Sequence, residues 1–219
     1  MTKIGTDNPR FIVIEGPIGV GKTTLARRLA ASFGTQLLLE GADENPFLAR
    51  FYSNPADAAL PTQLFFLFQR SRQLQNLRQG DMLQPTRVSD FLMEKDRLFA
   101  EITLDDDELS LYEQVYQQLT LDMPRPDLVI YLQAPVNVLL ARVEKRGSSY
   151  EKGMTAEYLQ RVSDAYSEFF YHYQESPLLI VNASEINLAE GNADFDILLK
   201  RISSIKRGRH YFNPLPDKL

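Results

Sequence analysis

The sequence predicts an α/β protein in which a five-stranded parallel sheet carries helices on both faces. Short apolar runs alternate along the chain with longer segments whose apolar residues recur at helical spacing. Such alternation is typical of strand–helix–strand units, whose parallel strands are buried on both faces. A length of 219 residues, with 44% hydrophobic and 24% charged residues, suits one globular domain over residues 1–219 and excludes disordered and fibrous classes.

Strands are expected where apolar residues gather in short runs between turn residues. The first run, Phe-Ile-Val-Ile, stops at Gly16-Pro17, and the second ends in Glu40-Gly41. The third is poor in apolar residues and ends in Asp90, whereas the fourth, Asp-Leu-Val-Ile-Tyr-Leu, gives the clearest strand pattern. The expected strands are residues 11–14, 37–39, 82–89, 127–132 and 178–181.

Helices are expected between these strands, where leucine and phenylalanine recur at helical spacing. Gly34 stands where a helix C-cap would, and Pro135 fits the first turn of a helix. Residues 146–153 are polar and flanked by glycine, which predicts a mobile loop. The expected helices are residues 23–33, 63–77, about 91–102, a segment after the acidic turn 105–108 to about 121, 135–145, 156–173 and 195–205.

The composition narrows the classes of function. The net charge of −5 argues against a nucleic-acid or anionic-membrane binder, because such proteins are usually basic. The chain has no cysteine, which excludes disulfide scaffolds, thiol catalysis and cysteine-ligated metals. The longest apolar run near the start covers only residues 11–14, far short of a secretory segment or a membrane span. We therefore expect a soluble cytoplasmic protein with no nucleic-acid or membrane partner.

One segment matches the phosphate-binding pattern G-x-x-x-x-G-K-[ST] in full. It reads Gly16-Pro17-Ile18-Gly19-Val20-Gly21-Lys22-Thr23, with an expected strand before it and an expected helix after it. Glycines let consecutive N–H groups point at phosphate oxygens, and the start of the helix adds its partial positive charge. Lys22 would reach the β- and γ-phosphates and Thr23 would bind Mg²⁺. The pattern predicts that this loop, together with Thr24, binds ATP, whereas the alternative is a glycine-rich turn that only begins a helix.

Other features favour a small-molecule kinase over other P-loop proteins. No N-K-x-D guanine motif occurs, and the strand before Asp90 lacks the apolar residues usual in GTPases and motor ATPases. Arg142 and Arg146 lie four residues apart at the end of an expected helix, so both side chains would project toward one anion. In such kinases a lid closes over the phosphates and its arginines neutralise the transferring group. The alternative is a solvated, charged helix face.

Five blocks of the sequence resemble the deoxynucleoside kinases, most closely the bacterial deoxyguanosine/deoxyadenosine kinase branch. They occur in that family's order and spacing and together cover almost the whole chain. The blocks are I-E-G-P-I-G-V-G-K-T-T-L (14–25), E-G-A-D-E-N-P-F-L-A-R-F-Y (40–52), Q-L-F-F-L-F-Q-R (63–70), S-D-F-L-M-E-K-D-R-L-F-A (89–100) and R-V-E-K-R-G-S-S-Y-E (142–151). The resemblance implies a P-loop kinase fold and a homodimer packed through helices, to which residues 63–77 would contribute.

The resemblance also implies catalytic residues. Glu40 matches the carboxylate beside the sugar 5′-hydroxyl, and it is our first choice as catalytic base because ligands of parallel sheets bind at the carboxyl ends of the strands. Asp90 matches an acidic residue assigned either to metal-bound water or to proton acceptance, and its alternative role is a helix N-cap. Lys22, Arg142 and Arg146 would spread positive charge over the transferring phosphoryl group.

Further matches concern the deoxynucleoside. Tyr52 and Glu151 match the pair that holds the sugar 3′-hydroxyl. The residues that match the readers of the base edge are Gln63, Arg70 and Asp96, of which the first two lie seven apart and so share a helix face. Surface or packing roles are the alternatives for all five.

The chain departs from the family pattern at two positions. Phe91, counted here with the substrate-binding residues, stands where many members have the arginine of a [DE]-R-[ST] motif, so a carboxylate- or phosphate-orienting charge is missing. The bacterial branch is similar in having an aromatic residue there. Ser148 stands where a third lid arginine is common, which leaves two arginines to carry the lid's charge.

Our hypothesis is transfer of the γ-phosphoryl group of ATP, with Mg²⁺, to the 5′-hydroxyl of a purine deoxynucleoside in nucleotide salvage. Deoxyguanosine and deoxyadenosine are not distinguished. One alternative is a nucleoside monophosphate kinase of the thymidylate type, whose second phosphate would be met by Arg50, Arg70 and Arg72. Others are a pyrimidine deoxynucleoside kinase and a non-enzymatic nucleotide-dependent regulator.

Overall fold

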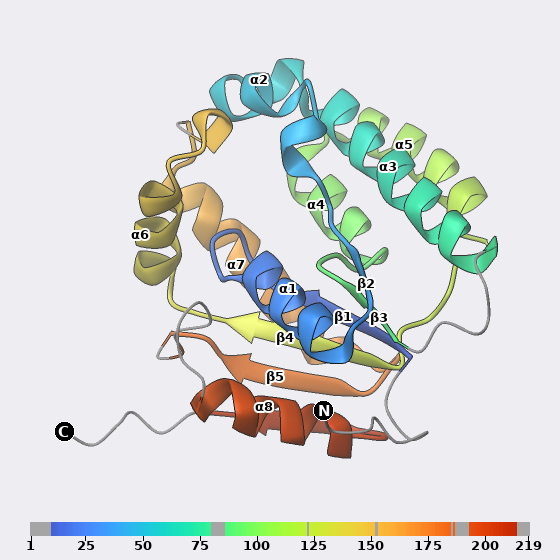
Figure 1. The fold of residues 1–219 in the computed structure, drawn as a ribbon. Coiled ribbons are helices and arrows are strands. Elements are labelled where there is room, and N and C mark those ends of the chain that lie inside the picture. The colour runs from blue at the N-terminus through green and yellow to red at the C-terminus, as the bar shows by residue number, and fades with distance from the viewer. Residues whose placement is uncertain are drawn as a thin grey trace.

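The computed structural model describes residues 10–79, 86–121, 123–151, 153–184, 186 and 193–213. In this part of the chain six strands form one parallel sheet in the order β2-β3-β1-β4-β5-β6 (Figure 1). The strands are β1 (Phe11–Glu15), β2 (Gln36–Leu38), β3 (Arg87–Ser89), β4 (Leu128–Gln133), β5 (Leu178–Asn182) and β6 (Arg209–Phe212). The expected α/β class with a helix-flanked parallel sheet is confirmed, but the sheet has six strands instead of five.

The unexpected strand is β6, which lies at the edge of the sheet beside β5. Its residues, Arg-His-Tyr-Phe, are half-buried or exposed, because an edge strand is covered less completely than a central one. It therefore lacks the apolar run by which the other strands were predicted. Of the weak third strand, residues 82–85 lie outside the described residues, and the pairing segment is Arg87–Ser89.

Helices fill the connections between the strands. They are α1 (Lys22–Phe33), α2 (Leu48–Ser53), α3 (Ala59–Gln79), α4 (Lys95–Thr103), α5 (Asp106–Thr120), α6 (Val136–Arg146), α7 (Ala156–His172) and α8 (Ala193–Ser204). Three short 3-10 turns are η1 (Ala42–Glu44), η2 (Pro55–Asp57) and η3 (Ser149–Glu151), the last within the expected loop 146–153. The short helix α2 was not predicted, because six residues hold too few turns to show a helical period.

The start of α4 also differs from the expectation, since it begins at Lys95 and not at residue 91. The N–H of Phe91 donates to Ser89 Oγ at 3.2 Å, and the N–H of Leu92 donates to Glu15 Oε1 at 2.8 Å. These backbone groups are therefore held by side chains before the helix starts. Asp90 in turn is not the N-cap of α4, which is Glu94.

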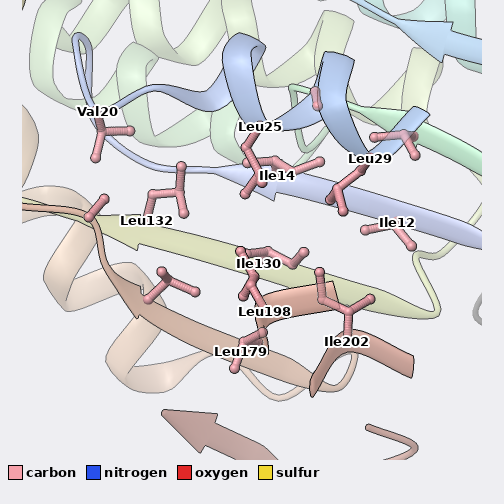
Figure 2. Packing of buried hydrophobic residues seen from close by; sticks show 14 of the residues in the cluster. Ile12, Ile14, Val20, Leu25, Leu29, Ile130, Leu132, Leu179, Leu198 and Ile202 are labelled. Carbon is pink, nitrogen blue, oxygen red and sulfur yellow. The ribbon is translucent and has the colours of Figure 1, made fainter. Parts of the chain in front are cut away.

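Alternation along the strands divides the core between the two faces of the sheet. Ile12 and Ile14 of β1 point to the face covered by α1 and α8, where Figure 2 shows them among Leu25, Leu29 and Ile202. Phe11 and Val13 belong to the core on the other face, which α3, α4, α5 and α7 cover. The two apolar cores hold the strands in place, and the strands in turn position the loops that follow their carboxyl ends.

Three of those loops meet at one edge of the sheet. The phosphate-binding loop follows β1, Glu40 follows β2, and Asp90 follows β3. Because these strands are parallel neighbours, residues far apart in sequence are brought together at their carboxyl ends. A small apolar cluster formed by α2 and the start of α3 lies beside this edge, and η3 packs against α2.

Candidate active site

The phosphate-binding loop has a backbone that requires its glycines. Gly16, Gly19 and Gly21 have φ values of 147°, 84° and 106°, which side chains rarely allow. A Cβ on Gly16 would lie 2.4 Å from the carbonyl oxygen of Leu132, and one on Gly19 would lie 2.7 Å from that of Leu139. The loop is therefore seated tightly against the end of β4 and against α6.

Lys22 lies over this loop at the start of α1. Its Nζ donates to the carbonyl oxygen of Gly16 at 2.7 Å and to that of Pro17 at 3.3 Å. Burial lowers the pKa of Lys22, and the positive charge of Lys95 lowers it further. Gly21, the N-cap of α1, supplies no side-chain cap, so the helix presents its positive end without a competing side chain. A loop of this geometry binds polyphosphate.

A single cavity brings most of the predicted site residues together. It opens beside the phosphate-binding loop and extends between the end of β2, α2, α3 and the segment that contains η3. The predicted residues that line it are Ile18, Gly19, Lys22, Thr23, Glu40, Tyr52, Gln63, Arg70, Asp90, Arg146 and Glu151. Gly16, Pro17, Val20, Gly21 and Thr24 belong to the loop and the start of α1 but do not line the cavity.

Asp90 joins the phosphate-binding loop to the residue after β2. The Thr23 hydroxyl donates to Asp90 Oδ2 at 2.5 Å, and the backbone N–H of Glu40 donates to Asp90 Oδ1 at 2.8 Å. Burial and the negative charge of Glu40 raise the pKa of Asp90. A hydroxyl beside a carboxylate supplies the oxygen ligands that Mg²⁺ prefers, and nucleotide phosphates usually complete such a site. Among the described residues no cluster of three or more acidic or histidine side chains could hold a metal ion.

Glu40 is held by two cations. Its Oε1 accepts hydrogen bonds from Arg70 Nη2 and, at 2.6 Å, from Lys95 Nζ. Burial alone would raise the pKa of Glu40, but the charges of Arg70 and Lys95 outweigh it and hold the pKa far below its ordinary value. Glu40 is therefore ionised at neutral pH, with 19% of its side chain exposed in the cavity.

Lys95 is the functional candidate that sequence reasoning missed. It lies in the quoted block 89–100, directly before Asp96, and its side chain is 3% exposed while it lines the cavity. A lysine at the start of an expected helix is normally a surface residue, so the sequence offered no signal for its burial. Its burial is explained by the tertiary structure, which places the carboxylates of Glu15 and Glu40, at the ends of β1 and β2, beside its ammonium group.

Arg70 connects Glu40 to Asp96. The Nη1 atom of Arg70 donates to Asp96 Oδ1, and this pair is almost fully buried, with side chains 3% and 0% exposed. Burial raises the pKa of Asp96 although Arg70 opposes the shift. Asp96 does not line the cavity, which differs from its expected role as a direct reader of the base. It holds Arg70, which does line the cavity.

Gln63 and Arg70 share one face of α3, as their spacing predicted, and both line the cavity. Gln63 is 3% exposed, and its Nε2 donates to Thr103 Oγ1 at 3.1 Å. This bond orients the side-chain amide of Gln63, which leaves its oxygen as an acceptor.

The residues expected at the sugar lie on α2 and η3. The ring of Tyr52 lies tilted against that of Phe51, with the centroids 5.3 Å apart, and edge-on against that of Tyr158, with the centroids 6.0 Å apart. Arg146 donates to both carboxylate oxygens of Glu151. The segment that follows η3 packs closely on α2, because a Cβ on Gly153 would lie 2.5 Å from the carbonyl oxygen of Tyr52.

Two predicted site residues lie away from the cavity. Arg142 donates to the carbonyl oxygens of Val20 at 3.2 Å and Ala183 at 2.8 Å, so it ties the phosphate-binding loop to the residue after β5 and does not point with Arg146 toward one anion. Phe91 is 1% exposed and packs in the core beneath α3 and α4, so it is not a substrate contact in this structure. Ser148, the other departure from the family pattern, brings no charge to the lid segment.

A phosphate-binding loop that shares a cavity with an ionised carboxylate defines a P-loop phosphotransferase, an enzyme that uses a nucleotide as phosphoryl donor. A family model described as deoxynucleoside kinase matches residues 12–206. The chain therefore belongs to the deoxynucleoside kinase family, and the expected fold and kinase activity are confirmed. Within the described residues no helix is both long and apolar enough to cross a membrane.

Individual relatives agree with this family. A deoxyguanosine kinase of Bacillus subtilis (strain 168) is 34% identical over 204 residues, which cover 89% of this chain and 97% of that protein. A deoxyadenosine kinase of Lactobacillus acidophilus is 29% identical over 204 residues, covering 86% and 93%. A solved structure of deoxyadenosine kinase from M. mycoides, with the products dCMP and a flexible dCDP bound, matches with a TM-score of 0.78 at 23% identity and covers 89% of this chain and 100% of that chain.

Proposed function

We propose that this enzyme transfers the γ-phosphoryl group of ATP to the 5′-hydroxyl of a purine deoxynucleoside, deoxyguanosine or deoxyadenosine, as a salvage reaction. The observation that carries this proposal is the cavity that Lys22, Glu40 and Arg70 share. It supplies a phosphate site, a proton acceptor and a hydrogen-bonding side chain in one enclosure. Relatives named deoxyguanosine and deoxyadenosine kinase support the purine.

On the donor side, the phosphate-binding loop and Lys22 would hold the β- and γ-phosphates. Thr23 and Asp90 would hold Mg²⁺, directly or through its water, and the ion would neutralise charge on the phosphates. The transition state of phosphoryl transfer is loose, so the protein mainly positions the reactants and stabilises charge. Arg142 contributes by holding the loop through Val20.

On the acceptor side, Glu40 would accept the proton of the 5′-hydroxyl. Its depressed pKa keeps it ionised, and a weak base suffices because little proton transfer is needed before the phosphoryl group moves. Asp90 is the second choice for this role. Its two oxygens already accept hydrogen bonds from Thr23 and Glu40, which supports a role in holding the metal and the loop.

Sugar and base would be bound on the α2 and α3 side of the cavity. Tyr52 and Glu151 would hold the 3′-hydroxyl, while Gln63 and Arg70 would meet the base edge. Arg70 Nε is buried without a hydrogen-bond partner in the described part of the chain, and such groups normally find partners. A purine edge, which offers acceptors, suits this donor.

Residues 146–153 are proposed as a lid that closes over the phosphates. Arg146 forms an ion pair with Glu151. Binding of the sugar to Glu151 would release Arg146 for the transferring phosphoryl group, where such an arginine stabilises charge.

The monophosphate-kinase alternative is less well supported. An acceptor that carries its own phosphate needs free positive charge, yet of Arg50, Arg70 and Arg72 only Arg70 lines the cavity. Its charge is already balanced by Glu40 and Asp96. The three arginines considered for a second phosphate therefore do not form such a site together.

A substrate panel tests the proposed function. The purified protein with ATP and Mg²⁺ is incubated with the four deoxynucleosides and their monophosphates, and products are separated by chromatography. We expect deoxyguanosine or deoxyadenosine to be phosphorylated fastest, and Lys22→Met to abolish turnover. Phosphorylation of monophosphates alone would contradict the proposal. Faster phosphorylation of pyrimidine deoxynucleosides would show that the substrate is not a purine deoxynucleoside. The absence of any turnover would favour a non-enzymatic regulator.

We also propose that the chain is a single domain and a homodimer. One sheet that joins strands from residue 11 to residue 212 supports the single domain. Phe68 on α3 and Leu111 on α5 are 48% and 49% exposed, and these helices pack side by side (Figure 1), which supports an apolar dimer face. Light scattering of the wild type and of Phe68→Glu tests the dimer, because a charge at this face should yield monomers.

A further inference from the structure

Lys95 occupies a buried position between two carboxylates at the edge of the cavity. Its Nζ lies 2.6 Å from Glu40 Oε1 and 3.4 Å from Glu15 Oε1. The lysine is 2% exposed, so its charge is shielded from water and acts strongly on both acids. A lysine buried in this way is seldom found without carboxylate partners.

Glu15 gives Lys95 a fixed anchor. Glu15 is completely buried at the end of β1, and its Oε2 accepts from the N–H of Gly16 at 2.9 Å and from the Tyr166 hydroxyl at 2.8 Å. Its Oε1 accepts from the N–H of Leu92 at 2.8 Å. These bonds tie Glu15 to the start of the phosphate-binding loop, to α7 and to the segment before α4. The ammonium of Lys95 is therefore held in place from the sheet side.

Lys95 and Arg70 act on the same oxygen of Glu40. Both donate to Oε1, while Oε2 accepts no hydrogen bond from any residue in the described part of the chain. The two cations thus orient the carboxylate and leave one oxygen for a hydroxyl group in the cavity. Arg70 is also bound to Asp96 and would adjust to the base, whereas Lys95 is anchored on the sheet.

We propose that Lys95 is a positioning residue for proton transfer from the substrate hydroxyl, and that it supplies from α4 the positive charge that residue 91 does not provide. This inference rests on the proposed function. Phe91 lies in the core away from the cavity, so the charge cannot come from that position. Lys95 acts through Glu40: together with Arg70 it holds Oε1, so that Oε2 faces the reaction.

The test compares Lys95→Met, Lys95→Arg and, as a matched control, Lys200→Met, which removes an exposed lysine of α8. We expect Lys95→Met to lower kcat roughly 10²-fold, because misplaced groups lose that much, with the KM for ATP unchanged. Lys95→Arg should restore part of kcat, and Lys200→Met should match the wild type.

Each outcome decides between the two proposals. An inactive wild type overturns the proposed function and this inference together. An active wild type, combined with a normal kcat in Lys95→Met, overturns only the role of Lys95. If Lys95→Met does not fold, as judged by circular dichroism, the double variant Lys95→Met/Glu15→Gln removes one charge of each sign. A double variant slower than Glu15→Gln alone supports the role of Lys95, and a double variant with the kcat of Glu15→Gln overturns it.

Discussion

The hydroxyl of Thr23 donates a hydrogen bond to Asp90, with 2.5 Å between Oγ1 and Oδ2. The two residues are 67 positions apart and meet because β1 and β3 are parallel neighbours, each ending at this edge of the sheet. The bond fixes the start of α1 relative to the residue after β3. It also places a hydroxyl and a carboxylate side by side where a metal–nucleotide complex would bind.

Asp90→Asn should weaken the use of Mg²⁺ more than the binding of ATP. The amide can still bond Thr23 but lacks the charge that attracts a hard cation. We expect the Mg²⁺ concentration for half-maximal rate to rise about tenfold or more. Titration of the rate with Mg²⁺ measures this, with Asp106→Asn at the exposed start of α5 as the control. An unchanged Mg²⁺ requirement would remove Asp90 from the metal site.

Glu40→Gln should lower kcat far more than it weakens ATP binding. The amide keeps the shape of the side chain but cannot accept the hydroxyl proton, and general bases contribute roughly 10²–10⁴-fold. Steady-state kinetics together with calorimetry of ATP binding measure the two effects. A kcat equal to that of the wild type would exclude Glu40 as the base and leave Asp90 as the candidate.

The same acid should make stability depend on pH. The pKa of Glu40 is lower in the folded than in the unfolded state, so its contribution is present above the ordinary pKa of about 4.3 and is lost as pH falls further. We expect the difference in free energy of unfolding between the wild type and Glu40→Gln to be largest near pH 7 and to shrink below about pH 4. Urea unfolding across this range measures it, and a difference independent of pH would contradict the ion pairs with Arg70 and Lys95.

The parts of the site that follow from local patterns were predictable from the sequence. The apolar run of β1 and the glycines after it identify the phosphate-binding loop, because both depend on neighbouring residues alone. The seven-residue spacing placed Gln63 and Arg70 correctly on one face of α3. Whether a side chain is buried depends instead on distant strands, so the burial of Lys95 and Phe91 did not follow from their neighbours.

Residue spacing predicts which helix face a side chain occupies, but it does not predict which group that side chain contacts. Arg142 and Arg146 lie one helical turn apart, yet one meets backbone carbonyls of Val20 and Ala183 and the other meets Glu151. The partners come from the phosphate-binding loop, from the residue after β5 and from η3, whose positions depend on the whole sheet. β6 escaped prediction for a related reason, since a half-buried edge strand needs no apolar run.

Arg142→Met should weaken ATP binding about tenfold while the KM for the deoxynucleoside stays the same. The variant loses charge-assisted bonds to Val20 and Ala183, each worth about 1.5–3 kcal/mol, so the phosphate-binding loop is held less firmly. Calorimetry of ATP binding measures the effect. A fall of about 10³-fold in kcat with normal ATP binding would instead mean that Arg142 reaches the phosphates, as an arginine finger does.

Gly153→Ala should hinder the packing of the lid segment on α2. The added methyl group would lie 2.5 Å from the backbone oxygen of Tyr52, which cannot move aside as the end of a flexible side chain can. Overpacking of this kind carries a penalty of about 1–3 kcal/mol, which corresponds to roughly five- to 150-fold in binding. We expect the KM for the deoxynucleoside to rise within that range, because Tyr52 and Glu151 lie on the two sides of this contact. Ser149→Ala, an exposed position in the same segment, is the control. If Gly153→Ala keeps the wild-type KM, the contact between the lid segment and α2 does not shape the sugar site.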